Sequence, residues 1–380
     1  TNYFNNLFNP VTIPLNVGEG YFVWSVTSAP DYATLNGTSN KTDVPVTLTV
    51  TPATNNSGWN LMGNPFPCVV DWNGNASWAL NNVGSTIYMF DAAGGNYKTW
   101  NFSTGIGTNG QSNGYIAATQ GFWVRTSDTL ASQSSYSLTI PEAERLADAT
   151  TDFYKDAGSQ ENILRINVKK DDFSDEYVLG INENATEGFD NDYDAYKMFP
   201  NSSAPLIYSS VGNTKLTVNS VPGIENGEII PLHFIPKEGG TCELTVDGLE
   251  GFIPELPVFL EDKKTHYFQN LREDAEYIFD SEMPDEIDRF VLHFSNPMGM
   301  DDIPGLLTDI NIWSWQNNVI VNAPGGIKGE LNIYDMLGKL VASSVLQEGR
   351  NEVQMNGSEG FFIVKVETEK GIKSEKVFIR

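Results

Sequence analysis

The sequence has few histidines and cysteines, the residues on which zinc sites and many nucleophilic active sites depend. It contains 3 histidines and 2 cysteines in 380 residues. His233, His266 and His293 stand alone, and no His-x-His, Glu-x-x-His or Cys-x-x-Cys spacing exists. Zinc sites usually draw on such spacings. We therefore expect a protein that is not an enzyme and has no cofactor, a calcium ion being the one candidate considered below.

The two cysteines, Cys68 and Cys242, lie far apart in the sequence. A disulfide between them remains open. Two buried free thiols are favoured, because an unpaired cysteine usually behaves as a small buried hydrophobic residue. Cysteine content therefore does not indicate the compartment.

Long apolar runs and positive charge are also missing. The hydrophobic content of 40% suffices for packed cores, but no apolar run of membrane-spanning length occurs. The 23 Lys and Arg face 49 Asp and Glu, giving a net charge of −26. Residues 151–296 hold most of this excess, with 11 basic against 29 acidic side chains. Because phosphate binding depends on clustered Lys and Arg, we expect no nucleic-acid binding.

Long helical periodicity is absent, and short extended runs take its place. Val44, Val46, Leu48 and Val50 alternate with Pro and Thr, which is the period-two pattern of a half-buried strand. Further runs in the middle of the chain are expected at 163–168, 176–182, 215–218, 229–234, 242–246, 258–261, 277–279 and 289–294. Near the C-terminus they are expected at 311–313, 319–322, 330–334, 339–345, 352–355, 361–367 and 373–379.

Many short strands separated by turn residues predict an all-β protein. We expect three antiparallel β-sandwich domains in series, each immunoglobulin-like or a jelly roll. Their expected bounds are residues 1–150, 151–296 and 305–380. Residues 297–304 have the Pro, Gly and acidic composition of a linker.

The last domain carries the most informative motifs. The segment from Tyr334 and Asp335 to Gly338 and Lys339 lies between two extended runs and has hairpin-turn chemistry, since Asp bonds nearby backbone and Gly supplies positive φ. A strand containing Gly360 and Phe362 follows. The chain then closes on Lys376, Val377, Phe378, Ile379 and Arg380.

These three motifs, in this order, resemble the type A C-terminal sorting domain of proteins exported by the type IX secretion system of Bacteroidetes. The resemblance implies an address rather than a catalyst, on a secreted or cell-surface protein that crosses the outer membrane. It implies three partners: an outer-membrane translocon, a β-barrel shuttle protein and a surface sortase. The alternative is a plain small sandwich, because Lys-flanked edge strands are common.

Upstream segments resemble modules of the same secreted proteins. The phrase Gly-Trp-Asn-Leu-x-Gly-Asn-Pro at 58–65, followed by 71–72 and 120–124, is similar to a module without an assigned activity. Residues 184–190, 194–197, 260–262 and 288–294 resemble a domain found just before the sorting domain. Since no signal peptide is visible at residues 1–4, we expect the C-terminal part of a longer exported protein, truncated within the first module.

Tryptophans in the first module raise a second hypothesis, a glycan-binding or adhesin module. Trp72, Trp78 and Trp100 are the candidate stacking platforms for surface glycans. Against this, aromatic residues are favoured in strands and bury large areas. Core positions are therefore the favoured interpretation. A glycosidase is a further alternative, because two carboxylates need meet only in space.

An acidic segment in the middle domain is the one candidate ion site. Calcium is bound by several carboxylate and carbonyl oxygens in flexible loops. The candidate ligands are Asp171, Asp172, Asp175, Asp190, Asp192 and Asp194. The spacing does not match an EF-hand, and solvated acidic turns are the favoured interpretation.

Overall fold

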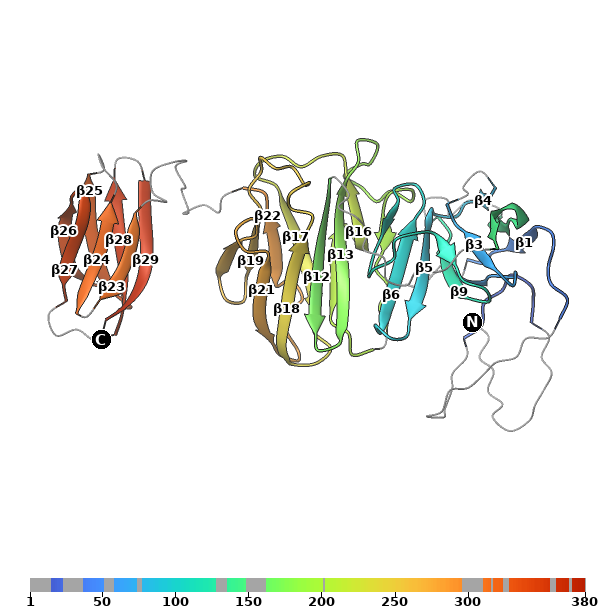
Figure 1. The fold of residues 1–380 in the computed structure, drawn as a ribbon, viewed down its shortest axis with the longest axis horizontal. Helices are drawn as coiled ribbons and strands as arrows, with labels where there is room; N and C mark the ends of the chain where they lie inside the picture. The colour runs from blue at the N-terminus through green and yellow to red at the C-terminus, as the bar shows by residue number, and fades with distance from the viewer. Residues whose placement is uncertain are drawn as a thin grey trace. The chain divides into compact units, whose positions relative to one another are not determined.

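The computed structural model describes most of the chain, with gaps. The described residues are 15–22, 37–50, 58–73, 77–127, 135–147, 162–200, 202–295, 310–315, 317–323, 328–355, 360–368 and 371–379. The chain divides into two compact units, Thr1–Phe294 (unit 1) and Ser295–Arg380 (unit 2). In the described part of both units the regular elements are strands and one short 3-10 helix, Glu142–Glu144, so the predicted all-β class is confirmed (Figure 1).

The first part of unit 1 is built from short strands in three sheets. The strands are β1 (Val44–Thr47), β2 (Trp59–Gly63), β3 (Val69–Asp71), β4 (Ala79–Asn81), β5 (Thr86–Asp91), β6 (Asn96–Asn101), β7 (Ile106–Gly107), β8 (Tyr115–Ile116), β9 (Gly121–Arg125), β10 (Ser137–Ile140) and β11 (Arg145–Leu146). The sheet orders are β1-β10-β4, β11-β3-β8 and β2-β9-β5-β6-β7. Their inner faces share one core that includes Met62, Trp72, Ile87 and Phe122.

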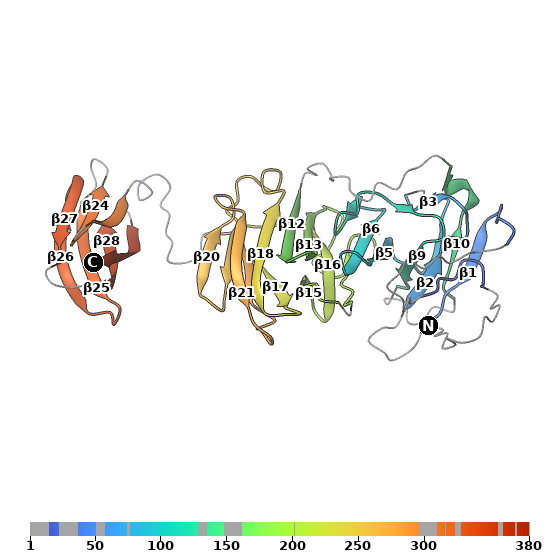
Figure 2. The same ribbon diagram turned by 60° about the horizontal axis from the view of Figure 1, so that its bottom comes forward.

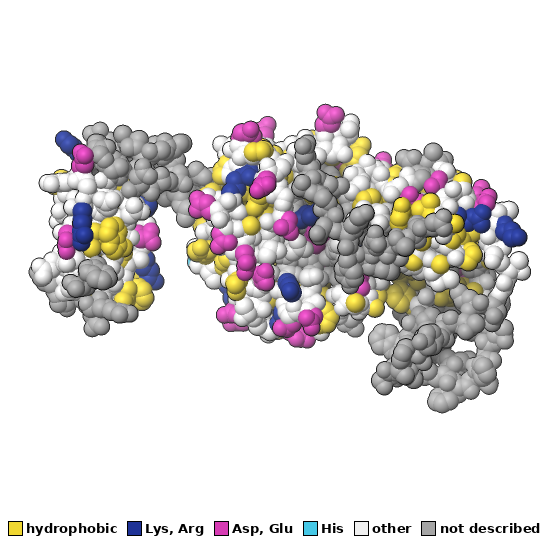
Figure 3. Space-filling view, in the orientation of Figure 1, with side chains coloured by type: hydrophobic (Ala, Val, Ile, Leu, Met, Phe, Trp, Pro, Cys, Tyr) yellow, Lys and Arg dark blue, Asp and Glu magenta, His cyan; other side chains and the backbone are white. Residues whose placement is uncertain are grey.

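The second part of unit 1 is one large sheet. Its strands are β12 (Ile163–Lys170), β13 (Phe173–Ile181), β14 (Ala195–Tyr196), β15 (Leu206–Val211), β16 (Thr214–Val221), β17 (Ile229–Ile235), β18 (Gly240–Asp247), β19 (Phe259–Asp262), β20 (Tyr267–Asn270), β21 (Glu276–Ser281) and β22 (Phe290–His293). The order is β20-β19-β22-β17-β15-β16-β13-β12-β18-β21, with β14 beside β16. Pairing is antiparallel apart from β13 with β16. The sheet encloses a core containing Leu164, Phe234 and Phe290, and Figure 3 shows Asp and Glu over its outer surface.

A buried arginine just before β22 ties the end of β19 to the loop that follows β21. The Arg289 side chain is 1% exposed and its Nε and Nη2 donate to the two Asp262 carboxylate oxygens at 3.0 and 2.7 Å. Its Nη1 donates to Asp285 at 2.8 Å. Planar, two-pronged bonding of this kind is a property of arginine and not of lysine. The segments 260–262 and 288–294, which carry part of the family resemblance, therefore meet in space for a structural reason.

The two parts of unit 1 share a further apolar cluster, here called the junction cluster. It joins Tyr88 and Ile106 of the first part to Ile163, Val178, Ala195 and Val218 of the second. Partly buried rings, among them Trp59 and Trp123, pack against it. Two domains were expected on either side of residue 150, but this packing makes residues 1–294 one compact unit. The turn-rich composition near 150 marks a change of sheet and not of unit.

The described residues of unit 2 form a small sandwich of seven strands. They are β23 (Asn311–Trp315), β24 (Asn318–Ala323), β25 (Gly329–Asp335), β26 (Leu340–Leu346), β27 (Gly349–Gln354), β28 (Gly360–Thr368) and β29 (Gly371–Ile379). The sheet β23-β24-β27 packs on β26-β25-β28-β29 (Figures 1 and 2). Each of the seven extended runs expected from the sequence is one of these strands. Inward residues such as Val321, Ile333 and Val364 form its core.

Two further expectations concern the linker between the units and the lack of membrane-spanning segments. The expected linker 297–304 lies outside the described residues, which end at 295 and resume at 310. Among the residues that are described, no helix is long and apolar enough to cross a membrane.

Candidate functional site: the terminal hairpin and strand

The hairpin between β25 and β26 is closed by the chemistry that the sequence predicts. The Asp335 Oδ1 accepts hydrogen bonds from the backbone N–H groups of Leu337 and Lys339, both at 2.9 Å. The Gly338 N–H donates to the Asp335 carbonyl at 3.0 Å. Gly338 has φ +78°, a conformation that strains side-chain-bearing residues. The register then shifts at Tyr334, which pairs with Leu340 across a β-bulge.

The strand after the hairpin places its residues alternately in the core and on the outer face. Phe362 of β28 lies between the sheets at 6% exposure and pairs with Asp335. Phe361 and Ile363, its neighbours, point outward at 51% and 39% exposure. Gly360 begins the strand at φ +135°, where glycine is favoured. The predicted Gly360 and Phe362 therefore start and anchor β28.

The last strand, β29, is the edge of its sheet and pairs along β28 from Gly360↔Ile379 to Thr368↔Gly371. Val377 and Ile379 are buried at 5% and 0% exposure, whereas Phe378 is 42% exposed. The Ser314 hydroxyl of β23 also donates to the Phe378 carbonyl at 2.7 Å. Arg380 lies outside the described residues.

An apolar group with one cation covers the outer face of this sheet beside its edge, and we call it the outer patch. It consists of Phe361, Ile363, Lys376 and Phe378. The Phe361 and Phe378 rings are 4.9 Å apart between centroids, and the Lys376 Nζ lies 4.5 Å from the Phe361 centroid. Exposed apolar groups of this kind mark interaction surfaces more often than isolated side chains do.

The hydrogen bonds of Asp335 in this hairpin should contribute measurably to the stability of unit 2. Replacing Asp335 with Ala should lower the free energy of unfolding of residues 295–380 by about 1–3 kcal/mol, because two backbone N–H groups lose their acceptor. Urea unfolding measures it. Met336→Ala, in the same turn and 56% exposed, is the control and should change stability by less than about 0.5 kcal/mol. Equal losses in both variants would contradict the role of the carboxylate.

The six candidate calcium ligands do not form one site. Asp171 and Asp172 lie exposed in the turn between β12 and β13, where the Lys170 Nζ contacts Asp171 at 2.7 Å. Asp175 is buried under the Lys197 ammonium and accepts the Ile207 N–H at 2.8 Å. No group of three or more His, Cys, Asp or Glu among the described residues could hold a metal ion. The calcium prediction is therefore wrong for this set.

The other three acids hold a loop against the rest of unit 1. The Asp194 oxygens accept the backbone N–H groups of Asp190 at 2.8 Å and Ser220 at 2.7 Å. Burial raises the pKa of Asp194 to about 7, and these two N–H groups oppose the rise. The Ser85 hydroxyl donates to Asp192 at 2.8 Å, which ties the loop to the residue just before β5 of the first part. The favoured interpretation of solvated turns holds for Asp171 and Asp172 and fails for the buried Asp175 and Asp194.

The three candidate stacking tryptophans are core residues. Trp72, Trp78 and Trp100 are 0%, 4% and 8% exposed. Their ring N–H groups donate to the Ser85 carbonyl, the Asp71 carbonyl and the Asn73 side chain. A sugar cannot reach these faces, so the glycan-stacking prediction is wrong for these rings, and the favoured core interpretation is confirmed.

The Gly-Trp-Asn-Leu-x-Gly-Asn-Pro phrase has a structural explanation in which Asn64 is central. Asn64 is 6% exposed, and its amide donates to the carbonyls of Cys68, Ile116 and Ala117. Its oxygen accepts the Phe66 N–H at 2.9 Å. One short side chain thus gives hydrogen-bond partners to four backbone groups of a buried loop, because asparagine offers both donors and an acceptor.

The two cysteines, Cys68 and Cys242, are both free, so the structure contains no disulfide between them.

One pattern with catalytic associations occurs in the first part. Residues 110–114 read Gly-Gln-Ser-Asn-Gly, which matches the Gly-x-Ser-x-Gly spacing of hydrolase nucleophile elbows. That elbow requires a strand, a sharp turn and a helix. Here the pattern lies between β7 and β8, two short strands, with no helix after it. The match therefore lacks the context that gives the serine its reactivity.

The hairpin, the Gly360 strand and the edge strand define unit 2 as the sorting domain of a protein exported by the type IX secretion system. Residues 315–380 match the family described as Secretion system C-terminal sorting domain. The protein is therefore exported across the outer membrane to the cell surface or the extracellular space. Residues 1–294 match the family described as Domain of unknown function (DUF8693), and the chain belongs to this family. The match ends at the residue where unit 1 ends.

Other comparisons add little. No curated protein matches the chain. A β-glucuronidase of Faecalibacterium prausnitzii is 10% identical over 91% of this chain and 48% of its own, with a TM-score of 0.19. A biofilm associated protein, BSP domain, is 11% identical over 93% and 84%, with a TM-score of 0.17. The chain thus spans about half the length of the β-glucuronidase. Neither likeness carries an argument about fold or activity.

Proposed function

We propose that the chain is a non-catalytic C-terminal part of a secreted or surface-attached protein, and that the outer-membrane translocon and a β-barrel shuttle protein recognise unit 2 through β29 and the outer patch. A surface sortase then removes unit 2. The observation that carries this proposal is the edge position of β29. This strand fills the core with Val377 and Ile379 and presents Lys376 and Phe378 outward on the same short segment.

An edge strand suits recognition for a physical reason. It offers backbone N–H and C=O groups to a partner strand, and natural proteins normally protect such edges. Here the Ser314 hydroxyl bonds the Phe378 carbonyl. Beside it the outer patch supplies apolar area and one positive charge. Main-chain pairing would then provide affinity, and the outer patch would provide selectivity.

The non-catalytic part of the proposal rests on the arrangement of polar groups in unit 1. His233 and His293 each pair with one carboxylate, Asp288 and Glu261, in strand positions on the sheet of the second part. The most buried acids bond Lys197, Arg289 or backbone N–H groups, so they support packing. These contacts support a structural role for groups that an enzyme would keep available to a substrate.

A reporter fusion tests the sorting role. A periplasm-directed fluorescent protein joined to residues 295–380 should reach the surface or the medium of a bacterium with a type IX system. The same fusion should remain periplasmic in a strain without the translocon. A reporter joined to residues 1–294 is the matched control and should remain periplasmic in both strains. Retention of the 295–380 fusion in the strain with the translocon would refute the proposal.

A further inference from the structure

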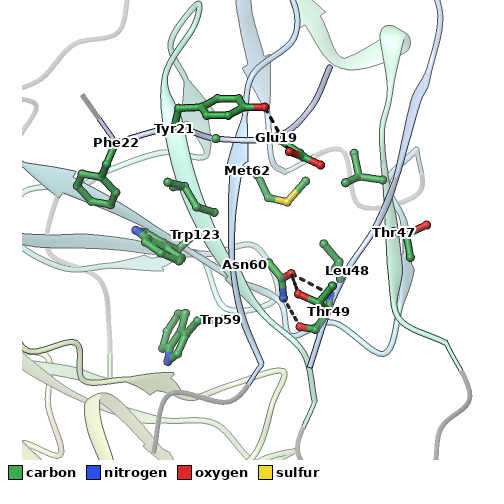
Figure 4. Close-up of a pocket in the computed structure, with 13 residues that line it drawn as sticks. Glu19, Tyr21, Phe22, Thr47, Leu48, Thr49, Trp59, Asn60, Met62 and Trp123 are labelled. Carbon is green, nitrogen blue, oxygen red and sulfur yellow. Dashed lines mark hydrogen bonds between the residues drawn. The ribbon is translucent and has the colours of Figure 1, made fainter. Parts of the chain in front are cut away.

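A small pocket opens in the first part of unit 1, along the outer edge of β2 (Figure 4). Its volume is about 210 Å³. Pockets for drug-sized ligands usually measure about 300–1,000 Å³, so this one suits a single small ring. The lining residues are Glu19, Gly20, Tyr21, Phe22, Val46, Thr47, Leu48, Thr49, Trp59, Asn60, Leu61, Met62 and Trp123.

Two segments are fixed to the β2 edge, and the gap between them is the pocket. On one side the Gly20 N–H donates to the Leu61 carbonyl at 2.9 Å, and the Gly63 N–H donates to the Gly18 carbonyl at 3.0 Å. A Cβ on Gly20 would stand 2.3 Å from the Met62 carbonyl oxygen, so this approach requires glycine.

On the other side, the Asn60 side chain accepts the Thr49 N–H at 2.9 Å and donates to the Thr49 carbonyl at 3.0 Å. This paired bonding holds the segment after β1 against β2. Both flanks of the pocket are thus set by hydrogen bonds to one edge strand. The pocket is built into the fold and does not depend on an induced rearrangement.

Aromatic rings form one wall of the pocket. Figure 4 shows Phe22, Trp123 and Trp59 in a row on one side of β2. The Phe22 and Trp123 centroids are 6.1 Å apart with planes at 45°, and Phe22 is 56% exposed. Trp59 is held from behind by the Tyr88 ring at 4.8 Å. The wall therefore combines fixed indoles with an accessible ring.

Polar groups occupy the other side, around Glu19, Thr47 and Thr49 (Figure 4). The Glu19 carboxylate accepts from the Tyr21 hydroxyl at 3.2 Å and from the Asn16 amide at 3.0 Å. The lining contains this carboxylate and no Lys or Arg. An anionic ligand would therefore face a negative charge that no cation of the lining offsets, which disfavours sugar acids and phosphates.

We propose that this pocket binds a neutral saccharide ring. A pyranose has C–H groups on its faces and hydroxyl groups on its rim, which matches a ring wall opposite carboxylate and hydroxyl groups. Ring faces carry negative charge density that attracts C–H groups, and the polar side offers acceptors and donors to the hydroxyls. The site lies on rings other than the buried Trp72, Trp78 and Trp100, and it does not depend on the sorting role of unit 2.

Isothermal titration of the whole 380-residue chain tests the proposal. The probes are methyl glycosides of glucose, galactose, mannose and N-acetylglucosamine, with glucuronate as the anionic control and tetramethylammonium as the cationic one. At least one neutral glycoside should bind saturably, and glucuronate should not. Trp123→Ala and Phe22→Ala should each weaken that binding by about tenfold, the scale of one aromatic contact.

The matched control is Trp313→Ala, which removes a 39% exposed indole from β23 of unit 2 and should leave affinity unchanged. Phe22 is the more exposed of the two test positions, so its variant remains informative if Trp123→Ala fails to fold. Binding that is equal in wild type and Phe22→Ala would overturn the proposal. So would a folded wild type that binds none of the four glycosides, or binding of tetramethylammonium alone.

Discussion

A chain that lacks its last five residues, 376–380, is expected to remain in the periplasm while unit 1 keeps its melting temperature. Deletion removes Val377 and Ile379 from the core of unit 2 and removes the second half of the edge strand β29. Unit 1 has cores of its own, so its stability should not change. Cell fractionation measures export, which should fall to background, and calorimetry measures the melting of unit 1.

Two point variants separate folding of unit 2 from its recognition. Ile379→Ala empties a position with 0% exposure and should cost about 2–5 kcal/mol of unit 2 stability. Phe378→Ser alters the exposed face of the same strand and should cost less, about 1 kcal/mol, because mainly the contact with the Phe361 ring is lost. If the outer patch is recognised, Phe378→Ser lowers export although unit 2 stays folded. Export of the shortened chain at the wild-type level would contradict the sorting role.

The second large effect concerns the buried ion pair of unit 1. Replacing Lys197 with Met should lower the free energy of unfolding by about 3–5 kcal/mol, because Asp175 would remain as a buried, unpaired carboxylate. The two side chains are 2% and 0% exposed. Burial lowers the pKa of Lys197, and the Asp175 carboxylate opposes that shift. Urea unfolding of the full chain, followed by the transition of unit 1, measures the loss.

Two controls make this result specific. Lys169→Met removes an exposed lysine of β12 and should change stability by less than about 0.5 kcal/mol. Adding Asp175→Asn to Lys197→Met removes the buried charge and should restore part of the loss. A double variant as unstable as the sum of the two single variants would show that the pair is not coupled.

Local chemistry is what the sequence predicts well here. The Asp335 turn could be predicted because its donors, acceptor and positive-φ glycine lie within five residues. The strands of unit 2 could be predicted because apolar residues alternate between bounding turns. β15 (Leu206–Val211) and β20 (Tyr267–Asn270) were not predicted, since the first reads as a continuous run and the second is a short edge strand without an apolar face.

Contacts between distant residues could not be predicted. Asp175 of β13 and Lys197, which follows β14, are 22 positions apart in the sequence. They meet because β13 and β14 both pair with β16. The pocket on β2 is lined by four segments from different parts of the first 125 residues. Composition alone does not tell the buried Trp72 from the partly exposed Trp123, because both lie among strand-forming residues. Their environments follow from the pairing of sheets.

The junction cluster determines how unit 1 responds to damage and to dissection. Because Tyr88 and Ile106 pack on Val178 and Val218, heat or denaturant should melt both parts of unit 1 in one cooperative transition. A fragment ending near residue 150 would expose Trp59, Tyr97 and Trp123 together. Such an apolar surface promotes aggregation. We therefore expect a fragment of residues 1–294 to keep its core buried, and a fragment ending near residue 150 to lose part of it.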